Sequence, residues 1–406
     1  MARKIKADDI FTGTAFTGPG HVLVTGDDGT VETIVPAADA GEGVEIMEGI
    51  LCPGFINAHC HIELSHMKDR IPQHIGLVDF VQAVMTQRAA TDEEKQEAMQ
   101  HAEEELYGSG TVAVGDICNT ADSVSLKKNS KLYWHNFIEI SGFVAAGAQK
   151  RFDAAKETLN YFEAQPSTFN LQPSTISPHA PYSVSKKLFS LINEATADQL
   201  ISIHNQESAA ENELYNNKSG NFLSLYKNFG IDISSFEPTG NSSFQSWLPY
   251  FTKAQKIISV HNTFTDRADL VFSGDHHPTA VGAQSRRRGS QPSTFNLQPS
   301  TLFFCLCPNA NLFIENVLPP VPLLIENNCR IVLGTDSYAS NTQLNIYDEI
   351  KTIQLHFPKI PLDSILQWAT LNGAQALGIE DKYGSFEKGK MPGVVLINIE
   401  TARRLI

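Results

Sequence analysis

The sequence has little cysteine and no long hydrophobic run, and these absences limit the class of protein. Only six cysteines occur in 406 residues, and none forms a Cys-x-x-Cys pair. We therefore expect free thiols in a reducing compartment, the cytoplasm, rather than a disulfide scaffold. No apolar run approaches the roughly 20 residues of a membrane span. The N-terminal MARKIKADDIF lacks the apolar stretch of a signal peptide.

Basic residues are also in deficit, with 31 lysines and arginines against 45 acidic residues and a formal net charge of −14. A surface of this charge repels phosphates, so neither a nucleic acid nor an anionic membrane is expected as a partner. We expect a small-molecule substrate as the binding partner. A homodimer is the expected alternative to a monomer. The length favours one large domain with an appendage.

The pattern of apolar residues changes near residue 50. Before it, short β-rich runs alternate with Gly and Asp turns. After it, eight β-like runs alternate with helical ones, which predicts an α/β fold, a (β/α)8 TIM-type barrel. The tail GSFEKGKMPGVVLINIE returns to short β-like runs, which we expect to pair with the N-terminal ones. The eight runs end near His61, Asn119, Ser141, Ser183, Ser208, Phe264, Asn311 and Asn341.

One segment, QPSTFNLQPST, occurs identically at 165–175 and 291–301. Two copies so far apart cannot stack as a structural repeat. Each copy falls between a predicted helix and the next strand, on the barrel face opposite the usual active site. We interpret both copies as poorly ordered inserted loops, with a docking peptide as the alternative.

Polar residues with metal-binding side chains stand at the carboxyl ends of several predicted strands, where barrel enzymes keep their chemistry. His59 and His61 are two residues apart, so in a strand they point to the same side. Several imidazoles with one carboxylate suit Zn²⁺, and Fe²⁺ binds similar ligands. The later strands contribute His179, His204, Glu207, His261 and Asp336.

These residues lie in motifs that resemble the amidohydrolase superfamily, in its branch of metal-dependent deaminases and chlorohydrolases. The resemblance implies a barrel catalytic domain over 51–384, with inserted loops near 165–175 and 273–301. It also implies a small β-sandwich built from 1–50 and 385–406. The matching motifs are PGFINAHCH, SPHAPYS, IHNQE, VHN, CPNAN, GTDSYASN and GSFEKGKMPG.

The resemblance further implies that one metal ion is held by four side chains. Two-metal members commonly bridge their ions with a carboxylated lysine on the fourth strand, and no lysine occurs between Thr175 and Ser183. His179 stands there instead and is expected to contact the substrate. We therefore expect one divalent ion, Zn²⁺ or alternatively Fe²⁺. The expected ligands are His59, His61, His204 and Asp336.

The expected reaction is hydrolysis of a C–N bond by metal-bound hydroxide, since such an ion lowers the pKa of water from about 15.7 toward about 7. Asp336 would accept the proton of the water, and His261 would hold or polarise it. Glu207 matches the glutamate of the family's HxxE motif, which implies a general acid that protonates a ring nitrogen before ammonia leaves.

The substrate is predicted only by class, a purine-type, adenine-nucleoside-like ring. HIELSH resembles members that deaminate 6-aminodeoxyfutalosine, an adenine nucleoside, more than those acting on S-adenosylhomocysteine or guanine. Glu63 would then bond a ribose or purine group, or else orient a histidine. A chlorohydrolase or cyclic amide hydrolase with the same metal site is the first alternative. A non-catalytic metal-binding scaffold is the second.

Overall fold

The computed structural model describes residues 2–165, 173–276 and 301–406, and its centre is built from eight parallel strands. They form two four-stranded sheets, ordered β10-β9-β8-β7 and β11-β12-β13-β14. Each strand overlaps one of the eight predicted runs, although β10 and β13 begin one or two residues before theirs. The strands are β7 (Phe55–Cys60), β8 (Thr111–Cys118), β9 (Tyr133–Ile140), β10 (Ser174–Pro178), β11 (Leu200–Asn205), β12 (Lys256–His261), β13 (Thr301–Leu306) and β14 (Ile331–Leu333).

The two sheets adjoin at both edges. Between β10 and β11, the N–H of His204 donates to the carbonyl of His179 at 2.9 Å. At the other edge, the N–H of Thr335, after β14, donates to the carbonyl of His59 in β7 at 3.0 Å. The carboxyl ends of strands from both sheets therefore meet, which brings residues far apart in sequence into one place.

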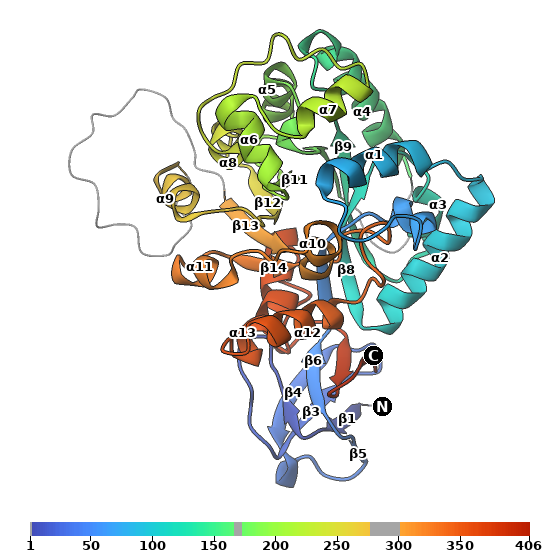
Figure 1. The fold of residues 1–406 in the computed structure, drawn as a ribbon. Helices are drawn as coiled ribbons and strands as arrows, with labels where there is room; N and C mark the ends of the chain where they lie inside the picture. Colours follow the sequence, from blue (N-terminus) through green and yellow to red (C-terminus); the bar gives the residue numbers. More distant parts are fainter. Residues whose placement is uncertain (1, 166–172, 277–300) are drawn as a thin grey trace.

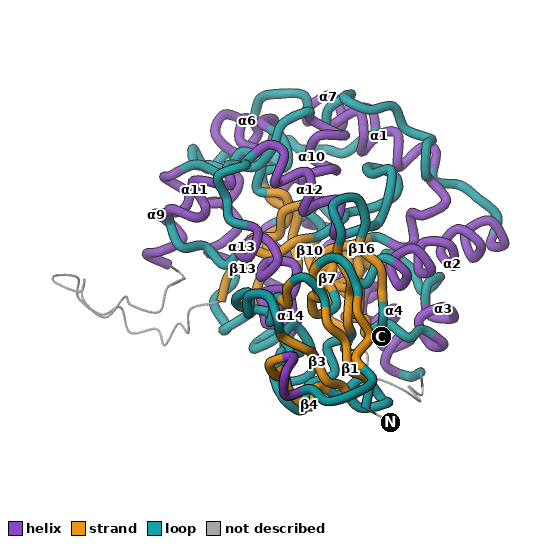
Figure 2. Tube along the Cα trace, turned by 90° about the horizontal axis from the view of Figure 1, so that it is seen from below, coloured by secondary structure: helices purple, strands orange, loops and turns teal. Residues whose placement is uncertain are grey.

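Helices surround the strands, which lie in the middle of the view from below (Figure 2). The order of elements alternates strand and helix, so the chain has the predicted α/β class. The helices are α1 (Leu77–Gln87), α2 (Asp92–Gly108), α3 (Val124–Asn129), α4 (Ala148–Glu163), α5 (Lys186–Ala195), α6 (Ala209–Asn217), α7 (Phe222–Asn228), α8 (Ser243–Trp247), α9 (Arg267–His276), α10 (Pro308–Glu315), α11 (Val321–Glu326), α12 (Ile346–His356), α13 (Leu362–Gln367) and α14 (Gly373–Leu377). Shorter turns are η1 (Ala37–Asp39), η2 (Ile62–Met67), η3 (Ala145–Gly147), η4 (Pro181–Ser183), η5 (Leu248–Tyr250) and the π-turn η7 (Trp368–Asn372).

The central strands are apolar along most of their length because both faces are covered. Every residue of β8, β7 and β11 is buried, as expected for parallel strands packed between layers. Gly115 in β8 has no room for a side chain, since a Cβ there would lie 2.6 Å from the carbonyl oxygen of Ala58. This close approach fixes β8 against β7, the strand that carries His59.

Strands from the two ends of the chain form two further four-stranded sheets, ordered β4-β3-β1-β5 and β16-β15-β6-β2. β15 pairs antiparallel with β6, which confirms that the tail pairs with the N-terminal region. Both termini lie at this end of the molecule (Figure 1). The strands are β1 (Arg3–Lys6), β2 (Asp9–Ile10), β3 (His21–Thr25), β4 (Val31–Pro36), β5 (Val44–Ile46), β6 (Ile50–Pro53), β15 (Val394–Ile397) and β16 (Ala402–Arg404).

The interpretation of the duplicated segments as loops needs a correction at their edges. Ser174 and Thr175 belong to β10, Thr301 opens β13, and residues 273–276 belong to α9. These edge residues therefore belong to strands or to a helix and not to loops. The remainder, 166–172 and 277–300, lies outside the described residues, so the loop interpretation there stays a prediction.

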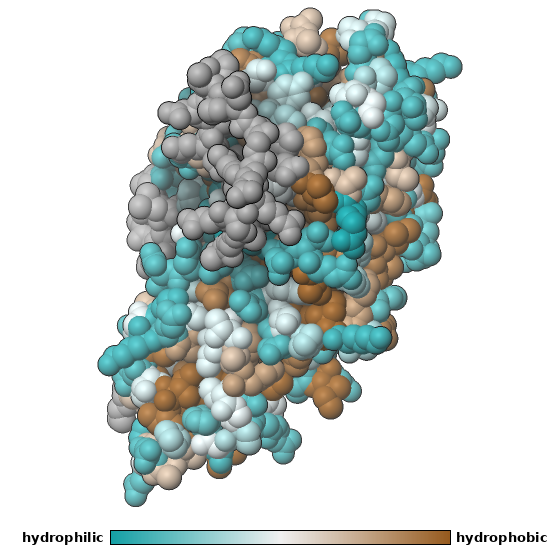
Figure 3. Space-filling view, turned by 90° about the vertical axis from the view of Figure 1, so that its left-hand side faces the viewer, coloured by the Kyte–Doolittle hydropathy of each residue, from teal (hydrophilic) through white to brown (hydrophobic). Residues whose placement is uncertain are grey.

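Across the described ranges, no helix has the length and apolar character needed to cross a bilayer. Hydrophilic and hydrophobic side chains are interspersed over the face shown in Figure 3. Single exposed apolar side chains of this kind are normal on a protein surface.

Candidate metal centre and catalytic cavity

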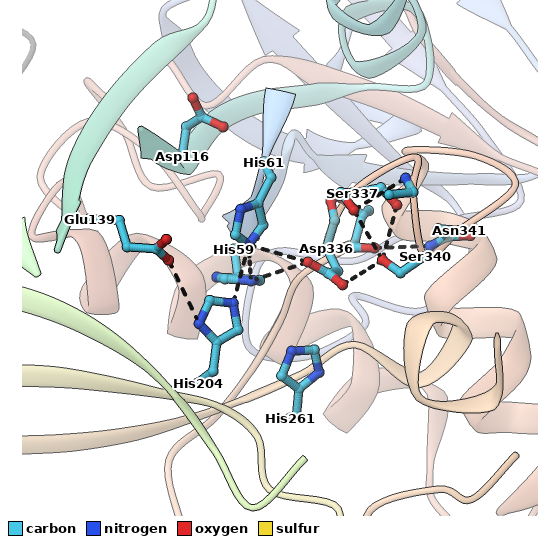
Figure 4. A network of polar contacts seen from close by, with 12 residues as sticks. His59, His61, Asp116, Glu139, His204, His261, Asp336, Ser337, Ser340 and Asn341 are labelled. Carbon is cyan, nitrogen blue, oxygen red and sulfur yellow. Dashed lines mark hydrogen bonds and ion pairs between the residues drawn. The ribbon is translucent and has the colours of Figure 1, made fainter. Parts of the chain in front are cut away.

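Ligand-type atoms from both central sheets converge beyond the carboxyl ends of β7, β11 and β14 (Figure 4). Nε2 of His61 lies 3.2 Å from Nε2 of His59 and 3.1 Å from Nε2 of His204. Oδ1 of Asp336 lies 3.5 Å from Nε2 of His59 and 3.4 Å from Nε2 of His61. All four side chains are buried. The structure thus brings together the four residues predicted as metal ligands.

The separations of these atoms fit a single ion. In tetrahedral coordination with bonds of roughly 2.0–2.1 Å, ligand atoms lie about 3.3–3.4 Å apart. Burial is the main cause that lowers the pKa of His59, His61 and His204 below its ordinary value. Neutral imidazoles offer the lone pairs that a metal requires. The donor set therefore suits one transition-metal ion such as Zn²⁺.

Neighbouring groups orient two of these ligands. Nδ1 of His204 lies 2.7 Å from the carbonyl oxygen of His179, to which it donates, so the lone pair is left on Nε2. The hydroxyl of Ser340 donates to Oδ2 of Asp336 at 2.5 Å, which leaves Oδ1 facing the histidines. Burial acts to raise the pKa of Asp336, but His61, His261 and Ser340 outweigh it, and the pKa is lowered. Asp336 is thus ionised, as a metal ligand must be.

His261, at the end of β12, lies beside this cluster. One ligand atom each from His59, His204, His261 and Asp336 falls within 4.8 Å of the others, so His261 is itself a possible ligand. Figure 4 draws no polar contact between His261 and the other three histidines, whereas His61 contacts two of them. We therefore favour His61 as the ligand. Nε2 of His261 has no hydrogen-bond partner among the described residues, which leaves it available to a water or a substrate.

Glu207 follows β11 and is buried against His261, with 3.6 Å between its Oε1 and Nε2 of the histidine. Its backbone N–H donates to Oε1 of Glu211 at 2.7 Å. Burial, followed by the negative charges of Asp336 and Glu211, raises the pKa of Glu207 well above its ordinary value. A carboxyl group that keeps its proton near neutral pH is what general acid catalysis requires.

The backbone at these strand ends adopts conformations that L-residues rarely take. Gln206, His261 and Asp336 have φ of 46°, 70° and 59°, in the left-handed region that favours glycine. Gln206 directly follows β11, His261 ends β12, and Asp336 lies three residues after the end of β14. Such strain concentrates at functional sites, where the surrounding structure holds it in place.

His179, directly after β10, also faces the cluster. Its ring centroid lies 4.9 Å from that of His204, and its Nδ1 lies 2.7 Å from the hydroxyl oxygen of Ser183. Burial lowers the pKa of His179 to about 4, so the ring is neutral. The contact with Ser183 leaves Nε2 for another group, which agrees with the expected contact to substrate.

Glu139 is a residue that the sequence analysis missed. It lies on β9, with Oε2 at 3.9 Å from Nδ1 of His204, and it accepts a hydrogen bond from the amide of Asn119 at 2.6 Å. Together with His179 and His204 it forms a second group of possible ligand atoms. Its position one residue before the end of an apolar β9 was a signal of the kind that identified the histidines.

Glu63 is placed differently from the other predicted residues. Its carboxylate accepts hydrogen bonds from the N–H groups of Asn119 and Thr120 at 3.0 and 3.1 Å, and from Ser123 at 3.4 Å. It does not line the cavity described below. These contacts favour a role in holding the segment after β8. They give no support to a contact with substrate or with a histidine.

A cavity of about 330 Å³ opens over the cluster, within the size range of small-molecule sites. Its polar lining includes all predicted catalytic side chains. Its apolar lining comes largely from α1 and α7. The polar residues are His61, Arg88, Asn119, Glu139, Ser141, Arg151, His179, Ser183, His204, Glu207, His261, Asp336 and Ser337.

The sequence model of the amidohydrolase family matches residues 50–404. An adenosine deaminase from Helicobacter pylori is 28% identical over 347 residues, which cover 84% of this chain and 77% of that protein. A 5′-deoxyadenosine deaminase from Methanococcus vannielii is 24% identical over 380 residues, covering 90% and 79% of the two chains.

Solved structures share the fold at lower identity. The aminofutalosine deaminase of Helicobacter pylori, in complex with methylthio-coformycin, has a TM-score of 0.78 at 23% identity, covering 98% of this chain and 92% of that one. An atrazine chlorohydrolase from Arthrobacter aurescens, solved with zinc, has a TM-score of 0.70 at 14% identity, covering 98% and 87%. These likenesses identify the α/β fold as TIM-barrel-like.

Proposed function

Because the chain belongs to the amidohydrolase family, we propose that it is a metal-dependent deaminase that releases ammonia from a purine-type nucleoside. The observation that carries the proposal is the position of Glu207: its buried carboxyl group, whose pKa burial raises, lies 3.6 Å from Nε2 of His261 in the cavity that the convergent ligand atoms line. Relatives named adenosine deaminase and 5′-deoxyadenosine deaminase support the purine nucleoside as the substrate class.

We assign the metal to His59, His61, His204 and Asp336, because their ligand atoms have the separations that one tetrahedral ion requires. Zn²⁺ is the ion we propose, with Fe²⁺ as the alternative. When bound, such an ion lowers the pKa of a water molecule toward about 7.

The remaining side chains divide the proton transfers. Glu207 gives its proton to a ring nitrogen, which makes the carbon that carries the amino group electrophilic. His261 holds the attacking water through Nε2, which has no partner among the described residues. Asp336 takes a proton from that water and passes it to the departing amino group, which leaves as ammonia. The hydroxyl proton that remains on the adduct returns to Glu207 as the C=O bond forms, so the glutamate is protonated again for the next turnover. His179 contacts the substrate through its neutral ring. Overall, water and the amino compound give the oxo compound and ammonia.

The hydrolytic alternatives would use the same ligands and the same cavity. Chloride leaves as an anion and needs no proton, whereas an amino group leaves readily only after protonation, which is the role we give to Asp336. The relatives named adenosine deaminase and 5′-deoxyadenosine deaminase favour deamination. The non-catalytic scaffold gains no support, because the family and the relatives named deaminases support an enzyme.

The finer architecture follows from the same contacts. We infer that the two central sheets close into one (β/α)8 barrel, because hydrogen bonds join them at both edges. We also infer that the segments 1–50 and 385–406 pack as a small β-sandwich beside a catalytic domain at 51–384, with the boundary a few residues later than 50 because β6 continues to Pro53. The homodimer, the cytoplasmic location and 6-aminodeoxyfutalosine as the substrate stay predictions.

Metal analysis combined with an ammonia-release screen tests the function. The purified protein is assayed for zinc and iron and then incubated with adenine, guanine and cytosine nucleosides. We expect one equivalent of metal and ammonia release from adenine nucleosides. Metal-loaded protein that releases no ammonia from any of these compounds would contradict the proposal.

A further inference from the structure

One buried charge of the chain takes no part in the proposed reaction. Lys127, on α3, has a side chain that is only 1% exposed, and it does not line the cavity over the metal centre. Its Nζ lies 5.1 Å from the centroid of the Trp134 ring and 5.5 Å from that of the Phe162 ring. A buried charge is costly unless polar groups bind it, so the contacts of this ammonium group indicate its role.

The ammonium group of Lys127 contacts side chains of two neighbouring strands. Nζ donates to Oδ2 of Asp116 at 2.5 Å and to Oδ1 of Asn136 at 2.9 Å, and it lies 3.2 Å from Sγ of Cys118. Asp116 and Cys118 belong to β8, and Asn136 belongs to β9. Burial acts to lower the pKa of Lys127, but the negative charge of Asp116 outweighs it, and the pKa is raised. Lys127 therefore stays positively charged.

The carboxylate of Asp116 links this charge to the metal centre. While Oδ2 binds Lys127, Oδ1 accepts the N–H of Ile62 at 2.8 Å. That N–H belongs to the peptide group that follows His61, and the carbonyl oxygen of the same group accepts the N–H of Leu64 at 3.1 Å. Both sides of this peptide group are thus held, directly beside a proposed metal ligand. Figure 4 shows the Asp116 carboxylate apart from the converging ligand atoms.

A space-filling role alone does not account for these contacts. A well-packed apolar pair of similar volume is commonly no less stable than a buried ion pair. No apolar side chain at position 116, however, could accept the N–H of Ile62, which would then be buried without a partner. The turn after β7 therefore needs the carboxylate, and a fully buried carboxylate needs the cation. Glu63 reinforces the same turn, since its carboxylate accepts the N–H groups of Asn119 and Thr120.

We propose that Lys127 is a positioning residue of the metal centre: its charge holds Asp116 on the N–H of Ile62, and this hydrogen bond orients His61 toward the ion. The inference rests on the proposed function, because His61 is a metal ligand in that assignment. It adds to that function a residue outside the cavity on which the affinity for the metal depends.

Two variants test the role of the charge. Lys127→Met removes the charge but keeps an unbranched stem. The double variant Lys127→Met/Asp116→Asn removes both charges, keeps an oxygen that can accept the N–H of Ile62, and should fold even if the single variant does not. The Kd for Zn²⁺ is measured by competition with a chromophoric chelator. We expect it to rise about 10- to 100-fold in Lys127→Met, as for other groups that orient metal ligands, and by less in the double variant.

Hydrogen exchange in the metal-free protein measures the positioning itself. Loss of the Lys127 charge should speed amide exchange in the segment 61–67 by about 10-fold, because the bond to the N–H of Ile62 is weakened. Lys128→Met is the matched control, since Lys128 is the next residue of α3 and is exposed. Ile5→Ala is a second control, since it removes a buried side chain from a terminal sheet and should lower only Tm. Both controls should keep the wild-type Kd and the wild-type exchange of this segment.

The outcomes separate the positioning role from a merely structural role and from the proposed function. A folded variant without the Lys127 charge that keeps either the wild-type exchange or the wild-type Kd for Zn²⁺ overturns the positioning role, even if its Tm is lowered as in Ile5→Ala. If the wild type itself binds no Zn²⁺, the proposed function fails instead. The exchange of the metal-free proteins then still shows whether Lys127 holds the segment after β7.

Discussion

Burial acts in opposite directions on the two kinds of titratable side chain in the cavity. It lowers the pKa of His59, His61 and His204 and raises that of Glu207. These shifts favour neutral histidines, the form that binds a metal, and a protonated glutamate, the form that can act as a general acid. The same burial thus supports both of the roles that we propose.

Replacement of Glu207 by Gln should show whether this residue is a general acid or a metal ligand. Because Gln keeps the shape but cannot donate a proton to the ring, we expect kcat to fall by about 10²–10⁴ with metal content unchanged. Steady-state kinetics and metal analysis measure the two quantities. Loss of the metal in this variant would make Glu207 a ligand instead.

The pH dependence of kcat should report the raised pKa of Glu207. The protonated form is the active one, so activity persists at pH values well above the ordinary range of a glutamate and falls as pH rises through the raised pKa. A pH–rate profile on metal-saturated enzyme measures this descending limb. The residual activity of Glu207→Gln should lack it, and an identical limb in both proteins would assign it to another group.

Replacement of His61 by Ala should remove the metal. Nε2 of His61 is within 3.5 Å of three other ligand atoms, so its loss leaves the set incomplete. We expect the variant to contain little metal and to have no measurable deaminase activity. His101→Ala, at an exposed position on α2, is the control that should keep both. One full equivalent of metal in His61→Ala would contradict the ligand assignment.

At the level of elements, the segments that follow the strands are held by buried carboxylates. Glu211, in the first turn of α6, accepts the N–H of Gln206 at 3.1 Å and that of Glu207 at 2.7 Å. These bonds stabilise the left-handed backbone at Gln206. Asp116, at the end of β8, similarly accepts the N–H of Ile62 at 2.8 Å, next to His61. The positions of the side chains on these segments therefore depend on hydrogen bonds to carboxylates that belong to other elements.

Close packing of β14 on β7 gives an element-level prediction. A Cβ at Gly334 would lie 2.8 Å from Cβ of His59 and 2.9 Å from Sγ of Cys305. Gly334→Ala should therefore displace His59, weaken metal retention on dialysis and destabilise the fold by about 1–3 kcal/mol. Thermal unfolding and metal analysis measure both effects. Gly108→Ala, where nothing lies within 4 Å of the new Cβ, is the control; equal metal retention in both would contradict the prediction.

At the level of the whole molecule, the proposed metal joins the two central sheets. His59 and His61 come from the end of β7 in one sheet, whereas His204 comes from β11 and Asp336 follows β14 in the other. Removal of the ion should therefore lower Tm, because a ligand that binds only the folded state stabilises it by about 2.7 kcal/mol at 100 times its Kd. Calorimetry before and after chelation measures the change, and added Zn²⁺ should reverse it. An unchanged Tm would argue against a metal that links the sheets.

Deletion of residues 277–300, with a short Gly-Ser linker between α9 and β13, should leave the enzyme active. The sequence of this segment is polar and rich in Gly, Ser, Pro and Arg, so its removal costs little buried apolar surface. Loop length itself changes stability by only about 0.6 kcal/mol per doubling. We expect kcat/KM within a few-fold of wild type. Loss of activity with metal retained would place the segment near the active site.

The sequence by itself determined the parts of this protein that depend on local pattern. Alternation of apolar runs identified the eight central strands, because side-chain period and strand burial are local properties. His-x-His at His59 and His61 predicted a pair of metal ligands for the same reason, since residues two apart in a strand share a side. The placement of polar residues at strand ends then predicted that His204, His261 and Asp336 would meet them.

Only the tertiary structure decided which atoms face one another. Glu63, two residues after His61, turns toward the segment after β8 because backbone N–H groups there bind its carboxylate. The side chains that line the cavity come from elements distant in sequence, and no local pattern shows which of them face one another. Local periodicity fixes the side of a strand on which a residue lies. The contacts of its side chain depend on how other elements pack against that strand, and this packing is a property of the whole folded chain.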